Sequence, residues 1–176
     1  MATYCVFEST NMASTHYAER IFDCVCTEDV ENGTFGYIEE LAEGESHIYK
    51  FVKGTKEGCK VIVVDQPAWT EDTSHMINQR KDKFVVEAGV PFRGRVVKVN
   101  DEMALSAEGF SGEPDVDKYV SINANGKLLV GNSPVTGSVM VGKIMRKRKM
   151  GSTLITSVRD YGYTRMMYEV KVESLA

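Results

Sequence analysis

The chain has 176 residues, of which 43% are hydrophobic and 26% are charged, and 21 Lys and Arg residues against 25 Asp and Glu residues give a net charge of −4. This composition excludes wholesale disorder, and the acidic balance argues against a protein that clamps nucleic acid with its whole surface. The length fits one domain, or one domain with an arm, and is sufficient for folding without disulfides or a structural metal.

The first 18 residues differ in composition from the rest. Residues 9–15 are small and mostly polar, and a short apolar patch that includes Tyr4, Val6 and Phe7 precedes them. Two interpretations remain open: a frayed terminus, or an extended N-terminal arm whose three apolar side chains dock on a neighbouring chain by strand addition. We therefore divide the chain into an arm over residues 1–18 and a β-rich domain over residues 19–176. The start lacks the features of a secretory signal, so we expect synthesis in the cytoplasm.

From about residue 20 onward, short runs rich in Val, Ile, Thr and Tyr alternate with turn residues, a pattern typical of half-buried strands. The predicted strands are residues 20–26, 47–52, 60–65, 92–99, 103–106, 118–122, 127–130, 139–146, 153–158 and 166–172. Asn125-Gly126 is the strongest hairpin signal, because apolar runs flank it on both sides. The pattern predicts an all-β fold, a β-sandwich or a β-barrel-like structure, with only minor helix.

Residues 69–83, within a loop over residues 66–83, form the longest stretch without a strand signature. They predict a polar loop with one helical turn at most, and loops of this length usually bind something or belong to an interface. Trp69, the only tryptophan, lies at the start of this loop. It is either a packing anchor for the loop or an anchor in an interface with a partner, where tryptophan is enriched.

No pattern in the sequence indicates a reaction. The histidines are not paired with each other or with a nucleophile motif, two nearby carboxylates lack the other ligands of a calcium loop, and the cysteines lack the spacing of a zinc site. Phosphate-binding glycine motifs are absent as well. We therefore predict no catalytic, metal or cofactor-binding residues, and a protein that is not an enzyme. The residues considered are His16, His47, His75, Asp115, Asp117, Cys5, Cys24, Cys26 and Cys59.

One run of four cations, Arg146 to Lys149, stands between two methionines. On a strand, alternate members of this run face opposite ways, which favours the exposed end of a hairpin. Contact with an acidic protein surface or with nucleic acid remains an alternative interpretation, although no aromatic RNA-binding motif accompanies the run. We expect no membrane contact, since no apolar run approaches the length of a membrane-spanning helix.

Three stretches resemble the head decoration proteins of tailed bacteriophages, which stabilise the capsid. They are residues 30–38, residues 88–110, and residues 118–123 together with the Asn-Gly hairpin that follows. The resemblance implies a β-rich protein on the outer capsid surface of the virion, with the major capsid protein as its partner, often as a trimer, and with a terminal arm that adds to capsid-protein strands. It implies no catalytic residues.

The predicted function is therefore a structural virion protein that binds and stabilises the capsid, with Tyr4, Val6, Phe7 and Trp69 as candidate partner contacts and no cofactor. Two alternatives remain. The first is another β-rich virion component, such as a tail-tube, neck or fibre-base subunit. The second is a barrel that binds a small ligand or nucleic acid, for which residues 146–149 would be the contact.

Overall fold

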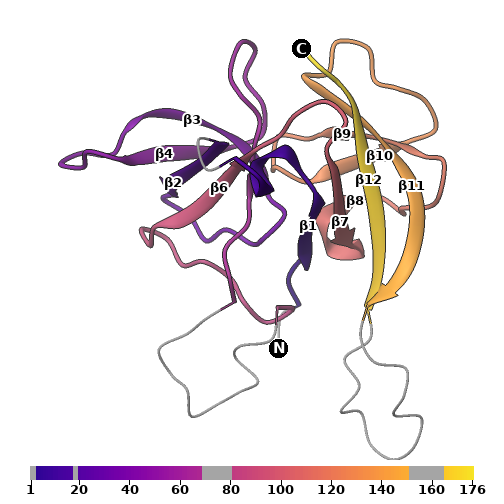
Figure 1. The fold of residues 1–176 in the computed structure, drawn as a ribbon, viewed down its shortest axis with the longest axis horizontal. Coiled ribbons are helices and arrows are strands. Elements are labelled where there is room, and N and C mark those ends of the chain that lie inside the picture. The colour runs from indigo at the N-terminus through magenta and orange to yellow at the C-terminus, as the bar shows by residue number, and fades with distance from the viewer. Residues whose placement is uncertain (1–2, 18–19, 69–80, 151–164) are drawn as a thin grey trace, which may run out of the picture.

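A computed structural model describes residues 3–17, 20–68, 81–150 and 165–176 of the chain. Strands account for 48% of the residues and helices for 5%, which confirms the prediction of an all-β fold. The strands form two sheets, one of seven strands and one closed as a five-stranded barrel (Figure 1). Within the described ranges, no helix is long and apolar enough to span a membrane.

The barrel is built from five consecutive strands between residues 21 and 96. Its strands are β2 (Ile21–Val25), β3 (Phe35–Leu41), β4 (Ile48–Lys53), β5 (Ile62–Val64) and β6 (Phe92–Val96). They follow the order β2-β4-β3-β5-β6, and β6 pairs with β2 to close the ring. The β2–β4 pair is parallel and the other four pairs are antiparallel.

The interior of the barrel is narrow, and its packing explains a glycine in β6. A Cβ atom on Gly94 would lie 2.6 Å from the Ile62 side chain and 2.9 Å from the Cys24 sulfur. These two side chains are fully buried. They belong to an apolar cluster that also contains Phe51 and Phe92. The rings of Phe51 and Phe92 meet edge to face with centroids 5.4 Å apart. The small residue thus leaves room for the side chains of the two strands that flank β6, Ile62 of β5 and Cys24 of β2.

The seven-stranded sheet combines the N-terminal strand with strands from the second half of the chain. Its strands are β1 (Phe7–Asn11), β7 (Glu102–Ser106), β8 (Phe110–Ser111), β9 (Tyr119–Ile122), β10 (Leu128–Gly131), β11 (Met140–Met150) and β12 (Arg165–Leu175). They follow the order β1-β7-β12-β11-β9-β10-β8, and only the short β8 joins its neighbour in parallel. Two single-turn 3₁₀ helices, η1 (Ala13–Thr15) and η4 (Ala107–Gly109), follow β1 and β7.

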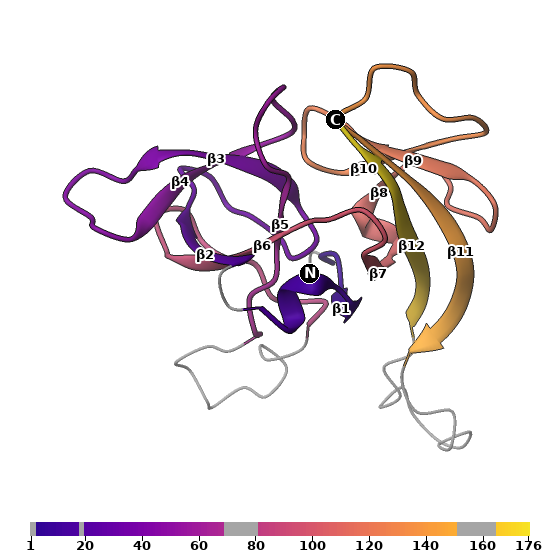
Figure 2. The same cartoon turned by 45° about the horizontal axis from the view of Figure 1, so that its top comes forward.

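The two sheets share one core. Phe35 and Val63 of the barrel belong to the same buried cluster as Leu105, Leu128 and Ile144 of the seven-stranded sheet. The barrel and the β11–β12 hairpin lie on opposite sides of this shared core, in both views of the molecule (Figure 2). The barrel and the sheet are therefore parts of one packed body.

The Asn-Gly turn between β9 and β10 connects the two parts. The amide of Phe35 donates a hydrogen bond of 2.7 Å to the carbonyl of Gly126. Gly126 has a φ of +76°, and a Cβ atom at this position would collide with the carbonyl oxygen of Phe35. The turn requires glycine both for its left-handed backbone and for this close approach. The predicted hairpin over residues 118–130 is confirmed by the antiparallel β9–β10 pair.

Other strand predictions were correct in part. Residues 47–52, 60–65, 103–106 and 166–172 coincide with β4, β5, β7 and β12, and β11 extends four residues beyond the end predicted for it. The sequence pattern missed β1 and β3. The predicted strand over residues 153–158 lies outside the described residues, as does most of the loop predicted over residues 66–83.

The division into a separate arm and a domain is wrong for the described part of the N-terminal segment. β1 pairs with β7 in the seven-stranded sheet, with Phe7 opposite Leu105 and Glu8 opposite Ala104. Val6 is completely buried and Phe7 is 4% exposed. The segment has too few apolar groups to form a core of its own, and the body of the same chain supplies the partners.

Candidate interaction surface

Three of the residues predicted as partner contacts, Tyr4, Val6 and Phe7, do not form an exposed surface. Val6 and Phe7 pack within the chain, and Tyr4 is half-buried, with its amide donating a hydrogen bond of 2.9 Å to the carbonyl of Asp82. Trp69 lies outside the described residues. The candidate contacts of the N-terminal segment therefore stabilise the body of the protein.

Two polar residues far away in the sequence fix this segment. The Val6 amide donates to the Ser106 hydroxyl at 2.9 Å, and the Ser106 amide donates to the Val6 carbonyl at the same distance. On the other side, the Cys5 amide donates to a Glu31 carboxylate oxygen at 2.7 Å. Because the amides of Cys5 and Val6 lie in the interior, side-chain acceptors replace the water that would otherwise bind them.

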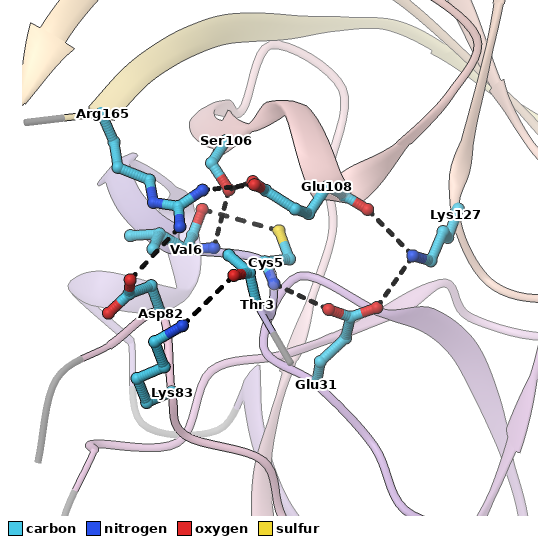
Figure 3. A network of polar contacts seen from close by, with 10 residues as sticks. All are labelled: Thr3, Cys5, Val6, Glu31, Asp82, Lys83, Ser106, Glu108, Lys127 and Arg165. Carbon is cyan, nitrogen blue, oxygen red and sulfur yellow. Dashed lines mark hydrogen bonds and ion pairs between the residues drawn. The ribbon is translucent and has the colours of Figure 1, made fainter. Parts of the chain in front are cut away.

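Ion pairs surround this segment and form what we call the polar junction, shown in Figure 3. Lys127 lies 3.0 Å from a Glu31 carboxylate oxygen and donates to the carbonyl of Glu108 at 2.9 Å. Arg165 contacts the carboxylate of Glu108 and lies 3.2 Å from that of Asp82, whose side chain is only 2% exposed. The junction thus connects β12, η4 and the loops beside the barrel.

The polar junction changes the ionisation of its members. Burial opposes ionisation of Glu108, but hydrogen bonds from Ser106 and Arg165 and the charge of Arg165 outweigh it and lower the pKa of this carboxyl. Burial and the nearby charge of Glu31 instead raise the pKa of the Cys5 thiol. The carboxylate is therefore held charged and the thiol neutral, so this cluster serves to hold the N-terminal segment in place.

A second set of ion pairs, which we call the charge ladder, crosses β1, β12 and β11. Lys81 lies 3.8 Å from Glu8, and the other carboxylate oxygen of Glu8 lies 2.5 Å from Arg148. Arg148 also donates to Glu169 at 2.7 Å, and Arg146 bonds the second oxygen of Glu169. Positive and negative groups thus alternate along the ladder, and networks of this kind are stronger than isolated surface pairs.

The register of the sheet places the ladder in one row. Glu8 of β1 and Glu169 of β12 both lie opposite Ala104 of β7, and Glu169 lies opposite Arg146 of β11. Ala104 is completely buried between the two carboxylate-bearing strands. Its small side chain leaves the space in which Arg148 reaches both glutamates.

The ladder divides the basic run into two classes of cation. Arg146 and Arg148 share Glu169, whereas Lys147 points to Asp115 of the neighbouring loop at 3.0 Å, a pair in which both side chains are more than half exposed. Lys149 is exposed and has no ion pair with any described residue. Three of the four cations therefore have a carboxylate partner, which weakens the nucleic-acid interpretation of the run, although the Arg146 side chain remains 67% exposed.

The outer edge of β11 is open over residues 145–150, which we call the open edge. β9 pairs with β11 only from Val141 to Lys143, and Ile144 exchanges hydrogen bonds of 2.9 Å with residues 117 and 118. Beyond Ile144, no main-chain group of the described ranges bonds to this edge. Met145 stands at the start of the edge with 49% of its surface exposed.

A groove lies elsewhere, where the loop after β2 faces β4 and the β9–β10 turn. It has a volume of about 500 Å³, and its charged groups include Glu28, Asp29 and Lys53. Lys53 donates to the Glu28 carboxylate at 2.9 Å and to the Asp29 carbonyl at 3.0 Å. The charged groups are thus paired with each other across the groove.

The described residues contain no cluster of three or more His, Cys, Asp or Glu side chains that could hold a metal ion. His16 and His47 are exposed, and His75 lies outside the described residues. Comparisons of the chain with protein-family models, curated proteins and solved structures find no match.

Proposed function

We propose that this chain is a non-enzymatic structural virion protein that binds and stabilises the outer surface of a phage capsid. The observation that carries the proposal is the β11–β12 hairpin, whose two strands of eleven residues present exposed cations, exposed methionines and the open edge on a rigid body. The resemblance of residues 30–38, 88–110 and 118–123 to head decoration proteins supports the same function.

The proposed attachment differs from the one expected from the sequence. An N-terminal arm would bind by folding onto the capsid, but residues 3–17 are already part of the body. We therefore assign the contact with the major capsid protein to the hairpin. A preordered surface loses little conformational entropy on binding, and a repeating lattice adds many modest contacts when the protein also associates with itself, for example as a trimer.

Binding to expanded empty capsids tests this proposal. The full chain is mixed with capsids at increasing ratios, and the bound protein is quantified after sedimentation. We expect saturation at a fixed ratio of protein to capsid subunits. Recovery with purified tails and not with heads would assign the chain to a tail component instead, and absence of binding to either would contradict a structural role in the virion.

A further inference from the structure

We propose that the open edge of β11 binds an extended, acidic segment of a partner protein as an additional antiparallel strand. The inference goes beyond capsid decoration and does not depend on it, because it concerns the main chain and charges of one strand. Three observations support it: main-chain groups with no partner among the described residues, exposed lysines at a two-residue spacing, and the poor fit of a second copy to the same edge.

The two sides of β11 differ in their main-chain pairing. One side of this strand pairs with β12 along its whole length, from Met140 opposite Leu175 to Met150 opposite Arg165. On the other side, no part of the chain that the structure describes pairs with β11 after Ile144. A strand in this position offers a row of amide and carbonyl groups, which is the surface that strand addition uses.

The side chains at the open edge indicate the charge of the added strand. Lys147 and Lys149 are two residues apart, so they lie on the same face of β11. Arg146 and Arg148 are held by Glu169, and Arg148 also by Glu8. An extended segment with carboxylates at every second residue would place its charges opposite the two lysines, and opposite charges on facing strands are stabilising.

A second copy of the same edge does not fit. Antiparallel pairing of two β11 strands would bring two basic runs, residues 146–149 of each chain, against each other. Like charges on directly opposite residues destabilise a strand pair. Lysines on an edge strand also protect sheets against unwanted pairing. This protective effect applies to neutral and basic strands, whereas an acidic segment is attracted.

A peptide assay with the full chain tests the proposal. The probe is a six-residue acetylated and amidated peptide that alternates Val and Glu, and its binding is measured by isothermal titration at low salt. A second peptide of the same sequence carries methyl groups on all internal amide nitrogens and cannot donate main-chain hydrogen bonds. We expect the methylated peptide to bind at least tenfold more weakly, and binding of the first peptide to weaken as salt is added.

Variants of the protein locate the site. The double variant Lys147→Glu/Lys149→Glu should bind the probe at least tenfold more weakly. The matched control Lys60→Glu/Lys98→Glu makes the same change in net charge at two exposed lysines away from β11 and should bind within twofold of the original protein. Circular dichroism checks that both variants keep their strand content.

Three results would overturn the proposal. Equal affinity of the methylated and unmethylated peptides would show attraction between charges without strand addition. Equal affinity of the Lys147→Glu/Lys149→Glu variant would place the site elsewhere, and absence of binding at millimolar peptide would show that the lysines only protect the edge. Since the assay contains no capsid protein, each of these results leaves the proposal of capsid decoration to its own test.

Discussion

Glu169 is a buried carboxylate that depends on cations from the neighbouring strand. It is 6% exposed and binds both Arg146 and Arg148. Burial opposes its ionisation, but the hydrogen bonds from the two arginines outweigh this effect and lower its pKa. We expect Glu169→Gln to reduce the free energy of unfolding by about 1–3 kcal/mol, the usual cost of removing a charged hydrogen-bond partner, as measured by urea denaturation at pH 7. The control Glu40→Gln, in an exposed pair with Lys50, should leave the midpoint unchanged.

Glu108 and Glu169 together predict how stability depends on pH. Both pKa values are lowered from the ordinary 4.5 of a glutamate. A carboxyl whose pKa is lower in the folded chain than in the unfolded chain stabilises the fold above pH 4.5. This contribution is lost as the pH falls through the pKa of the folded chain. We expect the urea concentration at the unfolding midpoint to decrease as the pH is lowered below 4.5. The Glu108→Gln variant should be less stable than the original protein at pH 7 but should lose less stability on acidification. Parallel curves for the two proteins would contradict this role of Glu108.

The thiols differ in reactivity because they differ in burial. Burial and the charge of Asp23 raise the pKa of Cys24 to about 12, and burial also raises the pKa of Cys5. Cys59 is only half-buried. Since the thiolate is the reactive form, we expect iodoacetamide at pH 8 to label Cys59 before Cys5 and Cys24 in the folded chain, as measured by mass spectrometry. Labelling of all four cysteines at equal rates would be expected only in denaturant.

At the scale of elements, the β9–β10 turn contacts β3 of the barrel and so connects the two sheets. Gly126→Ala places a methyl group against the Phe35 carbonyl in a left-handed backbone conformation. Gly44→Ala has nearly the same φ, +79°, but no atom lies within 4 Å of the new Cβ. We expect the Gly44 variant to lose about 1–2 kcal/mol, the conformational cost alone, and the Gly126 variant to lose clearly more. Equal losses in urea denaturation would show that the turn does not hold the sheets together.

The strand β1 is expected to be essential for stability. Phe7→Ala removes a buried aromatic side chain from the shared core, and such substitutions cost about 3–5 kcal/mol. The control Tyr17→Ala changes a residue that is 56% exposed and should have a much smaller effect. Thermal unfolding of the purified variants measures the difference. Similar midpoints for the original protein and Phe7→Ala would indicate that β1 detaches easily.

The sequence predicted the strands with strong local signals and missed β1, whose partner is distant, and β3, whose alternating pattern is concealed. The Asn125-Gly126 turn identifies β9 and β10 because both strands lie beside it. β1 has the sequence Phe-Glu-Ser-Thr-Asn and depends on β7, which is nearly a hundred residues away. β3 carries two adjacent glutamates and a glycine, which conceal its alternation.

The candidate surface was also predictable only in its local features. The run from Arg146 to Lys149 is visible in the sequence, and so is its position near the end of a hairpin. The ion pairs of its two arginines depend on Glu8 and Glu169, which the register of the strands brings together. No local pattern specifies that register, because it results from the packing of the whole sheet.

At the scale of the whole molecule, the shared core makes the barrel and the sheet interdependent. Phe35 and Val63 of the barrel are buried against Leu105 and Leu128 of the sheet. We expect a single cooperative transition in urea, with coincident curves from far-ultraviolet and near-ultraviolet circular dichroism. Two separate transitions would show that the barrel and the sheet unfold as independent units.

The order of the strands also has a consequence for synthesis on the ribosome. The five barrel strands are contiguous in the chain, so they leave the exit tunnel together and meet their partners early. β12 lies between β7 and β11 but is made last, several seconds after β7 at translation rates of about 5–20 residues per second. Until it inserts, β1 and β7 form an isolated pair with an unpaired side. The nascent sheet is therefore exposed to aggregation during this interval, and completion of β12 is the step that protects it.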